Sequence, residues 1–351
     1  MKYLYTGDLS QYSWSEARRR ILVNMGKNLL SIDETPYIDF FGKRFGNLQH
    51  KLGAGPGITV YNRALRKAAI QHRPEIIWVD KGSFVQPGTL DWIKQQTNAT
   101  VVNFNTDYLS NRKNYWRLHL NCLPLYDQYF TSNAFDVDYL KRRGVGEVMV
   151  LPLGYYAELF KNLPKLTAEE EARLGTDVGF IGHWEPATEA LVLKLLDCKL
   201  KLRVRGTSWH HARNKVRLAG TVESTFMPSD VFVKSIMATK INLGINSTIN
   251  RNQTSGRSCE IPAAGGFLLA QRTAEHEAMY VEGKEAEFFN TAEDIVIKVK
   301  YYLNHDTKRK EIAANGRLRC LRSGTSYEEM MEKMTIVLET RAKACHQTET
   351  L

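Results

Sequence analysis

Short apolar runs alternate with amphipathic segments along almost the whole chain, and this alternation constrains the fold more than any other feature. Runs that suit buried strands lie at residues 3–6, 76–80, 100–105, 128–131, 148–153, 178–181, 200–204, 241–245 and 267–270. Segments with helical spacing of apolar residues lie between them, among them 14–27, 61–72, 89–96, 188–196, 229–238 and 292–303. Strands that alternate with helices are typical of a parallel sheet covered by helices. The sequence therefore predicts an α/β fold.

The length of the chain favours two such layers rather than one, because 351 residues are long for a single core. A polar, charged stretch at 161–175 separates the two sets of strands and is interpreted as the linker and the first part of the second domain. The tail from 327 to 344 has a continuous helical pattern. We expect a first domain over 1–155, a second over 156–330 and a last helix in 331–351 that returns to the first domain. The glycine-rich run 52–57 is predicted to be a flexible loop.

Cysteine usage and hydropathy exclude several classes of protein. The five cysteines are odd in number, widely spaced and without a C-x-x-C pair, so neither a disulfide framework nor a zinc site is indicated: Cys122, Cys198, Cys259, Cys320 and Cys345. No stretch approaches the roughly 18 apolar residues of a membrane span. The first residues lack the long apolar region of a signal peptide. We expect a cytoplasmic protein.

The positive charge of the chain is concentrated in its first part. The net charge is +10, and residues 1–155 hold 20 Lys and Arg against 13 Asp and Glu, while the remainder holds 28 against 25. A basic first domain favours an anionic partner, such as an acidic glycan, a phospholipid surface or a nucleic acid. The charge is equally well explained by solubility alone.

The segment 254–270 is the most informative motif for function, because it places polar residues at the start of a short predicted helix between two strands. Ser255 and Gly256 stand where backbone N–H groups are unpaired, so an anion is stabilised there. Arg257 adds a planar cation suited to a diphosphate, and Glu260 shares its helix face. A carboxylate one turn from an anion site can accept ribose hydroxyls. The segment predicts a nucleoside diphosphate site.

Two more turns follow predicted strands and carry polar residues. Gly182 and His183 end the strand at 178–181, where a glycine lets a phosphate approach and the imidazole can donate to it. Arg205 ends the next strand, and Trp209 follows in the same loop. The loop is interpreted as framing a nucleobase, with Trp209 stacking on it or, equally well, packing beneath the loop.

Together these motifs resemble the C-terminal half of glycosyltransferases with the GT-B architecture, in which two Rossmann-like domains face each other across a cleft. The run Arg-x-x-Glu-Ile-x-Ala-x-Gly-Gly from Arg257 to Gly266 is similar to that of the spore maturation protein CgeB-like group. Segments 177–186 and 202–209 resemble the first two strands of that half and their turns. The first half matches more loosely, through 125–132 and 150–154.

The resemblance implies an enzyme that transfers sugar from a nucleotide-sugar donor, most simply a UDP-sugar, to an acceptor hydroxyl of a glycan, a lipid-linked intermediate or another anionic acceptor. It implies no cofactor besides this co-substrate and no required metal. Many retaining members carry two glutamates separated by seven residues, and the first position falls here on Asn252. The donor sugar and the stereochemical outcome therefore stay open.

Three other functions remain open at this stage. A basic acceptor domain also suits transfer to modified (hydroxymethyl-pyrimidine) bases of DNA, as phage enzymes of this architecture perform. A sugar-nucleotide epimerase shares the architecture but needs no acceptor. A non-catalytic nucleotide-sugar binding protein would explain the missing glutamate.

The first half offers catalytic and acceptor-binding candidates by position. Asp107 follows a strand, resembles an acidic position of the group and is a candidate base if the enzyme inverts. Orienting the acceptor, or capping the next helix, explains Asp107 equally well. Asp8 is a weaker competitor and an acceptor-binding candidate, and Lys81 is expected to help hold an anionic acceptor. Asp136 and Asp138 match the Asp-x-Asp of metal-dependent glycosyltransferases of another fold, but they open a helix and are interpreted as helix-capping residues.

Overall fold

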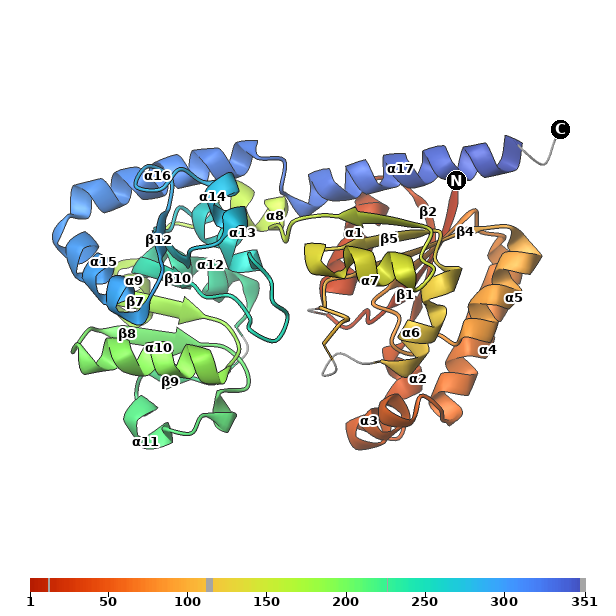
Figure 1. Cartoon of the computed structure of the whole chain (residues 1–351), viewed down its shortest axis with the longest axis horizontal. Helices are drawn as coiled ribbons and strands as arrows, with labels where there is room; N and C mark the ends of the chain where they lie inside the picture. The colour runs from red at the N-terminus through yellow and green to blue at the C-terminus, as the bar shows by residue number, and fades with distance from the viewer. Residues whose placement is uncertain (12, 112–115, 226, 348–351) are drawn as a thin grey trace. The chain divides into compact units, whose positions relative to one another are not determined.

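The computed structural model describes residues 1–11, 13–111, 116–225 and 227–347, and it divides into two compact units (Figure 1). The first domain combines Met1–Leu151 with the chain from Glu328 onward, and the second domain is Pro152–Tyr327. Each is a parallel sheet with helices around it, so the predicted α/β fold with two Rossmann-like domains is confirmed.

The first domain contains a six-stranded sheet in the order β2-β1-β3-β4-β5-β6, in which every pairing is parallel. Its strands are β1 (Lys2–Gly7), β2 (Asn28–Asp33), β3 (Ile76–Asp80), β4 (Thr100–Asn105), β5 (Gln128–Thr131) and β6 (Glu147–Val150). Its helices are α1 (Trp14–Asn24), α2 (Thr35–Ile38), α3 (Lys43–Leu52), α4 (Pro56–His72), α5 (Pro87–Thr97), α6 (Arg117–Cys122), α7 (Val137–Arg142) and α17 (Tyr327–Gln347). Short 3-10 turns lie at Leu123–Leu125 and Ala134–Asp136. The strand order reverses between β1 and β3, which fixes a topological switch point there.

The second domain contains another six-stranded parallel sheet, in the order β12-β11-β10-β7-β8-β9. Its strands are β7 (Thr176–Ile181), β8 (Leu202–Arg205), β9 (Val222–Glu223), β10 (Thr239–Gly244), β11 (Leu268–Gln271) and β12 (Glu287–Phe289). Its helices are α8 (Ala157–Lys161), α9 (Ala168–Leu174), α10 (Pro186–Asp197), α11 (Lys215–Leu218), α12 (Ser229–Ala238), α13 (Gly256–Ala263), α14 (Ala274–Met279), α15 (Ala292–Asn304) and α16 (Asp306–Arg322), with a 3-10 turn at Trp209–His211. This is the 3-2-1-4-5-6 order of dinucleotide-binding domains, and its switch point lies between β7 and β10.

The last helix is held to the first domain by buried and half-buried contacts. Glu339 in α17 accepts hydrogen bonds from the Tyr3 hydroxyl (2.7 Å) and from Lys27 Nζ (2.7 Å). Met331, Met334 and Leu338 of the same helix are almost fully buried. These contacts tie the end of the chain to its first strand. Among the residues that the structure describes, no helix is long and apolar enough to cross a membrane.

The stretch 161–175 lies within the second domain, where Thr167 and Glu170 form a capping box that starts α9. Two local predictions need correction. Half of the glycine-rich run is helical: only residues 53–55 separate α3 from α4, and Gly53 ends α3 with φ +64°. Asp136 does not cap α7 with its side chain; it accepts hydrogen bonds from the backbone and hydroxyl of Ser110 and from the backbone of Leu109.

Candidate functional site

The carboxyl ends of β7 and β10 form the switch point of the second domain, where open α/β sheets bind their ligands. The two strands pair in parallel, with Leu243 opposite Phe180. The loop after β7 contains Gly182 and His183, and the loop after β10 leads to α13. The predicted residues of both loops are therefore brought to one edge of one sheet.

Glu185 joins these two loops. Its carboxylate accepts hydrogen bonds from Ser247 Oγ (2.6 Å), from Thr248 N (2.9 Å) and Oγ1 (2.6 Å), and from His183 Nε2 (3.0 Å). Burial alone would raise the pKa of Glu185, but the hydrogen bonds from His183, Ser247 and Thr248 outweigh it and hold the pKa at about 2. The His183 side chain is 54% exposed, so one ring edge is oriented by Glu185 while the rest faces solvent.

The loop after β8 packs against the end of β7 and the loop that follows it. Trp209 donates its indole N–H to the Gly182 carbonyl oxygen (3.0 Å) and packs edge-on against Phe180. Only 3% of Trp209 is exposed, which speaks against the proposed stacking on a nucleobase and favours a packing role. Arg205 is also buried and pairs with Glu223 (2.9 Å), so its guanidinium supports the β8–β9 edge.

The start of α13 holds three buried polar atoms that find no hydrogen-bond partner in the described part of the chain: Ser255 Oγ, Arg257 Nη1 and Glu260 Oε2. Arg257 Nη1 and Glu260 Oε2 lie 2.8 Å apart, as an ion pair without hydrogen-bond alignment. Buried polar groups in native proteins are nearly always hydrogen-bonded, so a group of such atoms at a helix start favours a position where a ligand supplies the partners. Donors and an acceptor are both present, as a phosphate beside a ribose requires.

Burial sets the electrostatics of this helix start. The pKa of Glu260 is raised by burial, and the charge of Arg257 offsets part of that rise. The Arg257 guanidinium stacks over the Phe232 ring at 4.5 Å, which fixes its plane. A Cβ at Gly256 would lie 3.1 Å from Glu260 Oε2, so the glycine keeps space beside the carboxylate.

A buried histidine that the sequence reasoning missed fixes the first turn of α13. Burial lowers the pKa of His276 to about 4, against the effect of its hydrogen bond to the Gln271 carbonyl (2.7 Å), so the ring is neutral. Since Nδ1 donates to that carbonyl, Nε2 accepts the hydroxyl proton of Ser258 (2.7 Å). Ser258 Oγ in turn accepts from Ser255 N (3.0 Å). The helix start is therefore held by a continuous hydrogen-bond chain from β11.

The first domain gathers its predicted residues at the carboxyl ends of β1, β3 and β4. Lys81 Nζ lies 3.1 Å from Asp107 Oδ2 and 4.3 Å from the centre of the Trp116 ring. Lys81 has φ +64°, a left-handed backbone conformation that is strained for a residue with a Cβ. Strain of this kind at a sheet's switch point is typical of functional positions. Lys81 and Asp107 are therefore placed together, as an acceptor site requires.

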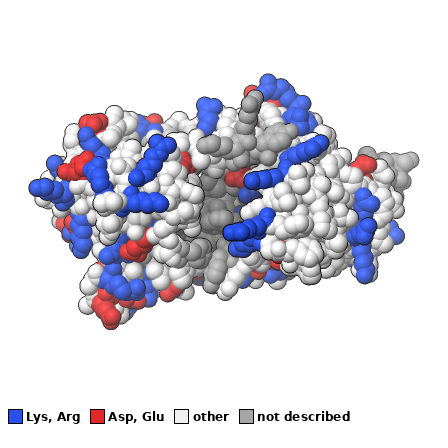
Figure 2. All heavy atoms as spheres, turned by 90° about the horizontal axis from the view of Figure 1, so that it is seen from below, with Lys and Arg blue, Asp and Glu red and all other residues white. Residues whose placement is uncertain are grey.

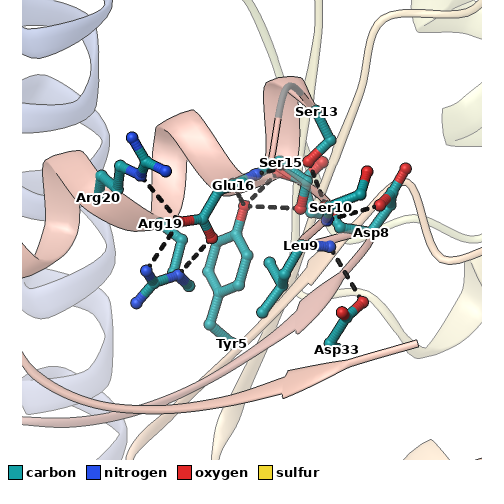
Figure 3. Close-up of polar contacts among 11 residues, drawn as sticks. Tyr5, Asp8, Leu9, Ser10, Ser13, Ser15, Glu16, Arg19, Arg20 and Asp33 are labelled. Atoms are coloured by element: carbon teal, nitrogen blue, oxygen red, sulfur yellow. Dashed lines mark hydrogen bonds and ion pairs between the residues drawn. The ribbon is translucent and has the colours of Figure 1, made fainter. Parts of the chain in front are cut away.

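Asp8 lies in the loop after β1, where its carboxylate is partly used by the loop itself (Figure 3). Its Oδ1 accepts hydrogen bonds from Ser10 N (2.9 Å) and Thr35 Oγ1 (3.1 Å). Asp33, at the end of β2, accepts from Leu9 N (3.1 Å) beside it. Asp8 is exposed, and these bonds order it rather than bury it.

Beneath these residues lie two buried carboxyl groups. Asp80 forms a bidentate ion pair with Arg18 (2.7 and 2.8 Å) and is 2.7 Å from the Tyr5 hydroxyl, so it is fully paired. Glu34 is 6% exposed, and its Oε2 has no hydrogen-bond partner among the described residues. Burial, and next the charge of Asp8, raise the pKa of Glu34 to about 8. No local sequence pattern signals this burial, because a glutamate that follows an edge strand is buried only through tertiary packing.

Metal coordination was not expected from the sequence. Within the described ranges, no group of three or more His, Cys, Asp and Glu side chains is arranged to hold a metal ion. Asn252, where a second glutamate stands in many relatives, lies partly buried in the loop ahead of α13.

Solved structures of glycosyltransferases share this fold at low sequence identity. Anabaena HepE in complex with UDP-glucose has a TM-score of 0.68 at 12% identity, over 97% of this chain and 100% of that one. Sucrose-phosphate synthase from Thermosynechococcus elongatus has a TM-score of 0.68 at 11% sequence identity, and the match covers 98% of this chain and 100% of that one. A glycosyltransferase from Rickettsia africae has a TM-score of 0.64 at 12% sequence identity, and the match covers 97% of this chain and 98% of that one. No curated protein sequence matches the chain.

The fold is therefore that of the two-domain GT-B class. Within this class, residues 186–335, which span most of the second domain, match the family described as glycosyl transferase-like. The fold and the family match together support a glycosyltransferase of group 1, as the sequence resemblance implied. The finer resemblance to the CgeB-like group stays a prediction.

Proposed function

We propose that this protein transfers a sugar from a UDP-sugar to a hydroxyl group of a glycan, a lipid-linked intermediate or another anionic acceptor. The observation that carries the proposal is the set of buried atoms at the start of α13 that have no hydrogen-bond partner among the described residues: Ser255 Oγ, Arg257 Nη1 and Glu260 Oε2. HepE, a structural neighbour, is described with UDP and with UDP-glucose, which supports the choice of nucleotide.

The second domain is the proposed donor domain. The backbone N–H groups at the start of α13 and the Arg257 guanidinium hold the diphosphate, and the Glu260 carboxylate accepts the ribose hydroxyls. His183, oriented by Glu185, donates from the loop after β7 to a diphosphate or sugar oxygen. These groups stabilise the negative charge that develops on the leaving UDP.

The first domain is the proposed acceptor domain. During transfer, the bond between the anomeric carbon and the phosphate oxygen breaks, its electron pair leaves with UDP, and the acceptor oxygen bonds to that carbon. The acceptor hydroxyl gives up its proton, and Asp107 is the proposed base in an inverting reaction. Lys81, 3.1 Å from Asp107, steers that carboxylate and attracts an anionic acceptor.

The test is release of UDP from UDP-sugars, measured with and without a panel of glycan and lipid acceptors. We expect wild type to release UDP, and we expect Arg257→Ala and Glu260→Gln to reduce kcat/KM for the donor at least tenfold. Matched controls are Arg322→Ala and Glu311→Gln, which remove the same chemical groups from exposed positions of α16. If the site variants and the controls behave alike, the assignment of the donor site is wrong.

Two outcomes would favour the alternative functions. Conversion of the donor sugar to its epimer without any acceptor, seen by NMR, would indicate an epimerase. Binding of UDP-sugars without turnover under any acceptor would indicate a binding protein. Acceptor-dependent UDP release excludes both.

A further inference from the structure

One face of α3 in the first domain exposes apolar and basic side chains side by side. Positions 43, 44, 47, 48, 51 and 52 of this helix are all exposed, a spacing that puts them on one side of it. Phe40 and Phe41, directly ahead of the helix, are 76% and 67% exposed, and Leu48 and Leu52 are 50% and 59% exposed. We call this surface the α3 face; it consists of Phe40, Phe41, Lys43, Arg44, Asn47, Leu48, Lys51 and Leu52.

The opposite side of α3 is packed against the rest of the first domain. The α3 face is therefore exposed on a helix whose orientation is held by these contacts. Gln49 is buried, donates to the Ile38 carbonyl (3.1 Å) and accepts from Gly57 N (2.8 Å). Gly46 is buried against Ile38 and Asp39, where a Cβ would clash with Asp39 Oδ1 and lie 3.2 Å from the Ile38 carbonyl oxygen. Phe40 and Phe41 meet edge to face, with ring centres 4.9 Å apart. Two neighbouring phenyl rings held in water in this way are uncommon on a monomeric protein surface.

The segment that contains the α3 face carries charge of one sign. Residues 40–74 contain seven Lys and Arg and no Asp or Glu. The nearest acidic residue before them, Asp39, is half-buried against Gly46. Figure 2 looks at the side of the molecule on which α3 lies; uncharged atoms cover much of the first domain there, with Lys and Arg side chains around them. The surface therefore combines exposed apolar groups with unopposed positive charge.

We propose that the α3 face docks onto the surface of an anionic lipid bilayer. Phenyl and leucyl side chains gain from burial among the head groups and upper acyl chains, while Lys43, Arg44 and Lys51 extend to lipid phosphates. A nucleic acid would account for the positive charge but would leave four large apolar side chains in water. A second copy of the chain would cover the apolar groups but would bring like charges together.

The α3 face lies next to the proposed acceptor residues within the first domain. His50 lies on the inner side of α3, and the centre of its ring is 6.2 Å from the centre of the Trp116 ring. Lys81 Nζ in turn lies 4.3 Å from the centre of the Trp116 ring. A bilayer on the α3 face would therefore present an anionic, lipid-borne hydroxyl near Lys81 and Asp107. This last step rests on the proposed function, whereas docking itself does not.

The test is co-sedimentation of the full chain with vesicles of phosphatidylcholine alone and of phosphatidylcholine with about 30% phosphatidylglycerol, at low and at physiological salt. We expect binding only to the anionic vesicles, weaker at higher salt. Each basic side chain lost near the membrane should weaken binding about fivefold, so Lys43→Gln, Arg44→Gln and Lys51→Gln together should weaken it about 100-fold. Phe40→Ser with Phe41→Ser should also abolish most of the binding.

The control is Ile297→Ser with Lys300→Gln on α15, where Ile297 is 67% exposed; this variant should bind like wild type. Since all substituted groups are exposed, every variant should keep the wild-type circular dichroism and melting temperature. Absence of binding to anionic vesicles, or equal binding by wild type and the α3-face variants, would overturn the proposal. So would a wild-type dimer that the α3-face variants convert to monomer, because the surface would then be an interface between copies. Loss of UDP release with vesicle binding intact would concern the proposed function alone.

Discussion

Glu34 allows the sharpest test of the electrostatics in the first domain. Its carboxyl is buried at the end of β2, and its pKa is raised to about 8 from 4.5, first by burial, then by the charge of Asp8, with smaller contributions from Asp80 and Asp33 and an opposing one from Lys81. The folded protein therefore keeps a proton on Glu34 at pH values where the unfolded chain has lost it. We consider the substitution Glu34→Gln, which keeps the shape and cannot ionise.

The sign and size of the effect follow from proton linkage. Between pH 4.5 and 8 the folded state binds one proton more than the unfolded state at Glu34, so stability falls by about 1.4 kcal/mol for each pH unit. Below pH 4.5 the contribution is constant, and above pH 8 the full cost of an ionised buried carboxylate is present. Between about pH 5.5 and 7.5, the free energy of unfolding of Glu34→Gln should rise relative to wild type by about 2.7 kcal/mol.

Urea unfolding of both proteins at these two pH values measures this difference. Glu332→Gln, an exposed carboxylate of α17 in the same domain, is the control and should show no comparable pH dependence. A difference between wild type and Glu34→Gln that is the same at both pH values would refute the argument, because Glu34 would then titrate alike in the folded and unfolded states.

Three further predictions concern residues that support the two candidate sites. Each is tested by measuring the free energy of unfolding in urea. Arg18→Ala should destabilise the first domain by about 3–5 kcal/mol, because Asp80 would be left buried and unpaired; a loss below about 1 kcal/mol would contradict this. Gly206→Ala should destabilise the second domain by more than 1 kcal/mol, because φ is +141° and a Cβ would clash with the Gly182 carbonyl; wild-type stability would be the contrary result. Glu185→Gln should lower the free energy of unfolding by about 3 kcal/mol at pH 7. The deficit relative to wild type should shrink as the pH falls from 4.5 toward 2, since the pKa of Glu185 in the folded protein is about 2. A deficit that persists at pH 2 would show that the charge is not the cause.

Much of the fold could be predicted from the sequence where burial is nearly complete. The runs 76–80, 100–105 and 128–131 were expected as strands and are β3, β4 and β5, since each is buried along its whole length and contains consecutive β-branched or aromatic residues. The edge strand β2 was not expected, because most of its residues are only partly buried and its sequence mixes polar with apolar side chains. The helix α3 was also missed: Gly42 and Gly53 flank it and Gly46 lies inside it, and glycine is unfavourable within helices.

The candidate donor site was predictable because it is local in sequence. Ser255, Gly256, Arg257 and Glu260 lie within six residues, and helix geometry alone brings them together. The parts that were missed depend on distant contacts. His276 reaches Ser258 from another helix, and the buried state of Trp209 depends on how two loops pack, which no local pattern records.

Calorimetric titration of the full chain with UDP tests the central claim most directly, because it needs neither the donor sugar nor the acceptor. We predict that wild type binds UDP at one site, and that Arg257→Ala and Glu260→Gln each weaken binding at least tenfold, as expected for the loss of a charged hydrogen bond. Arg322→Ala and Glu311→Gln should bind like wild type. Absence of UDP binding by wild type, or equal binding by wild type and both site variants, would contradict the account.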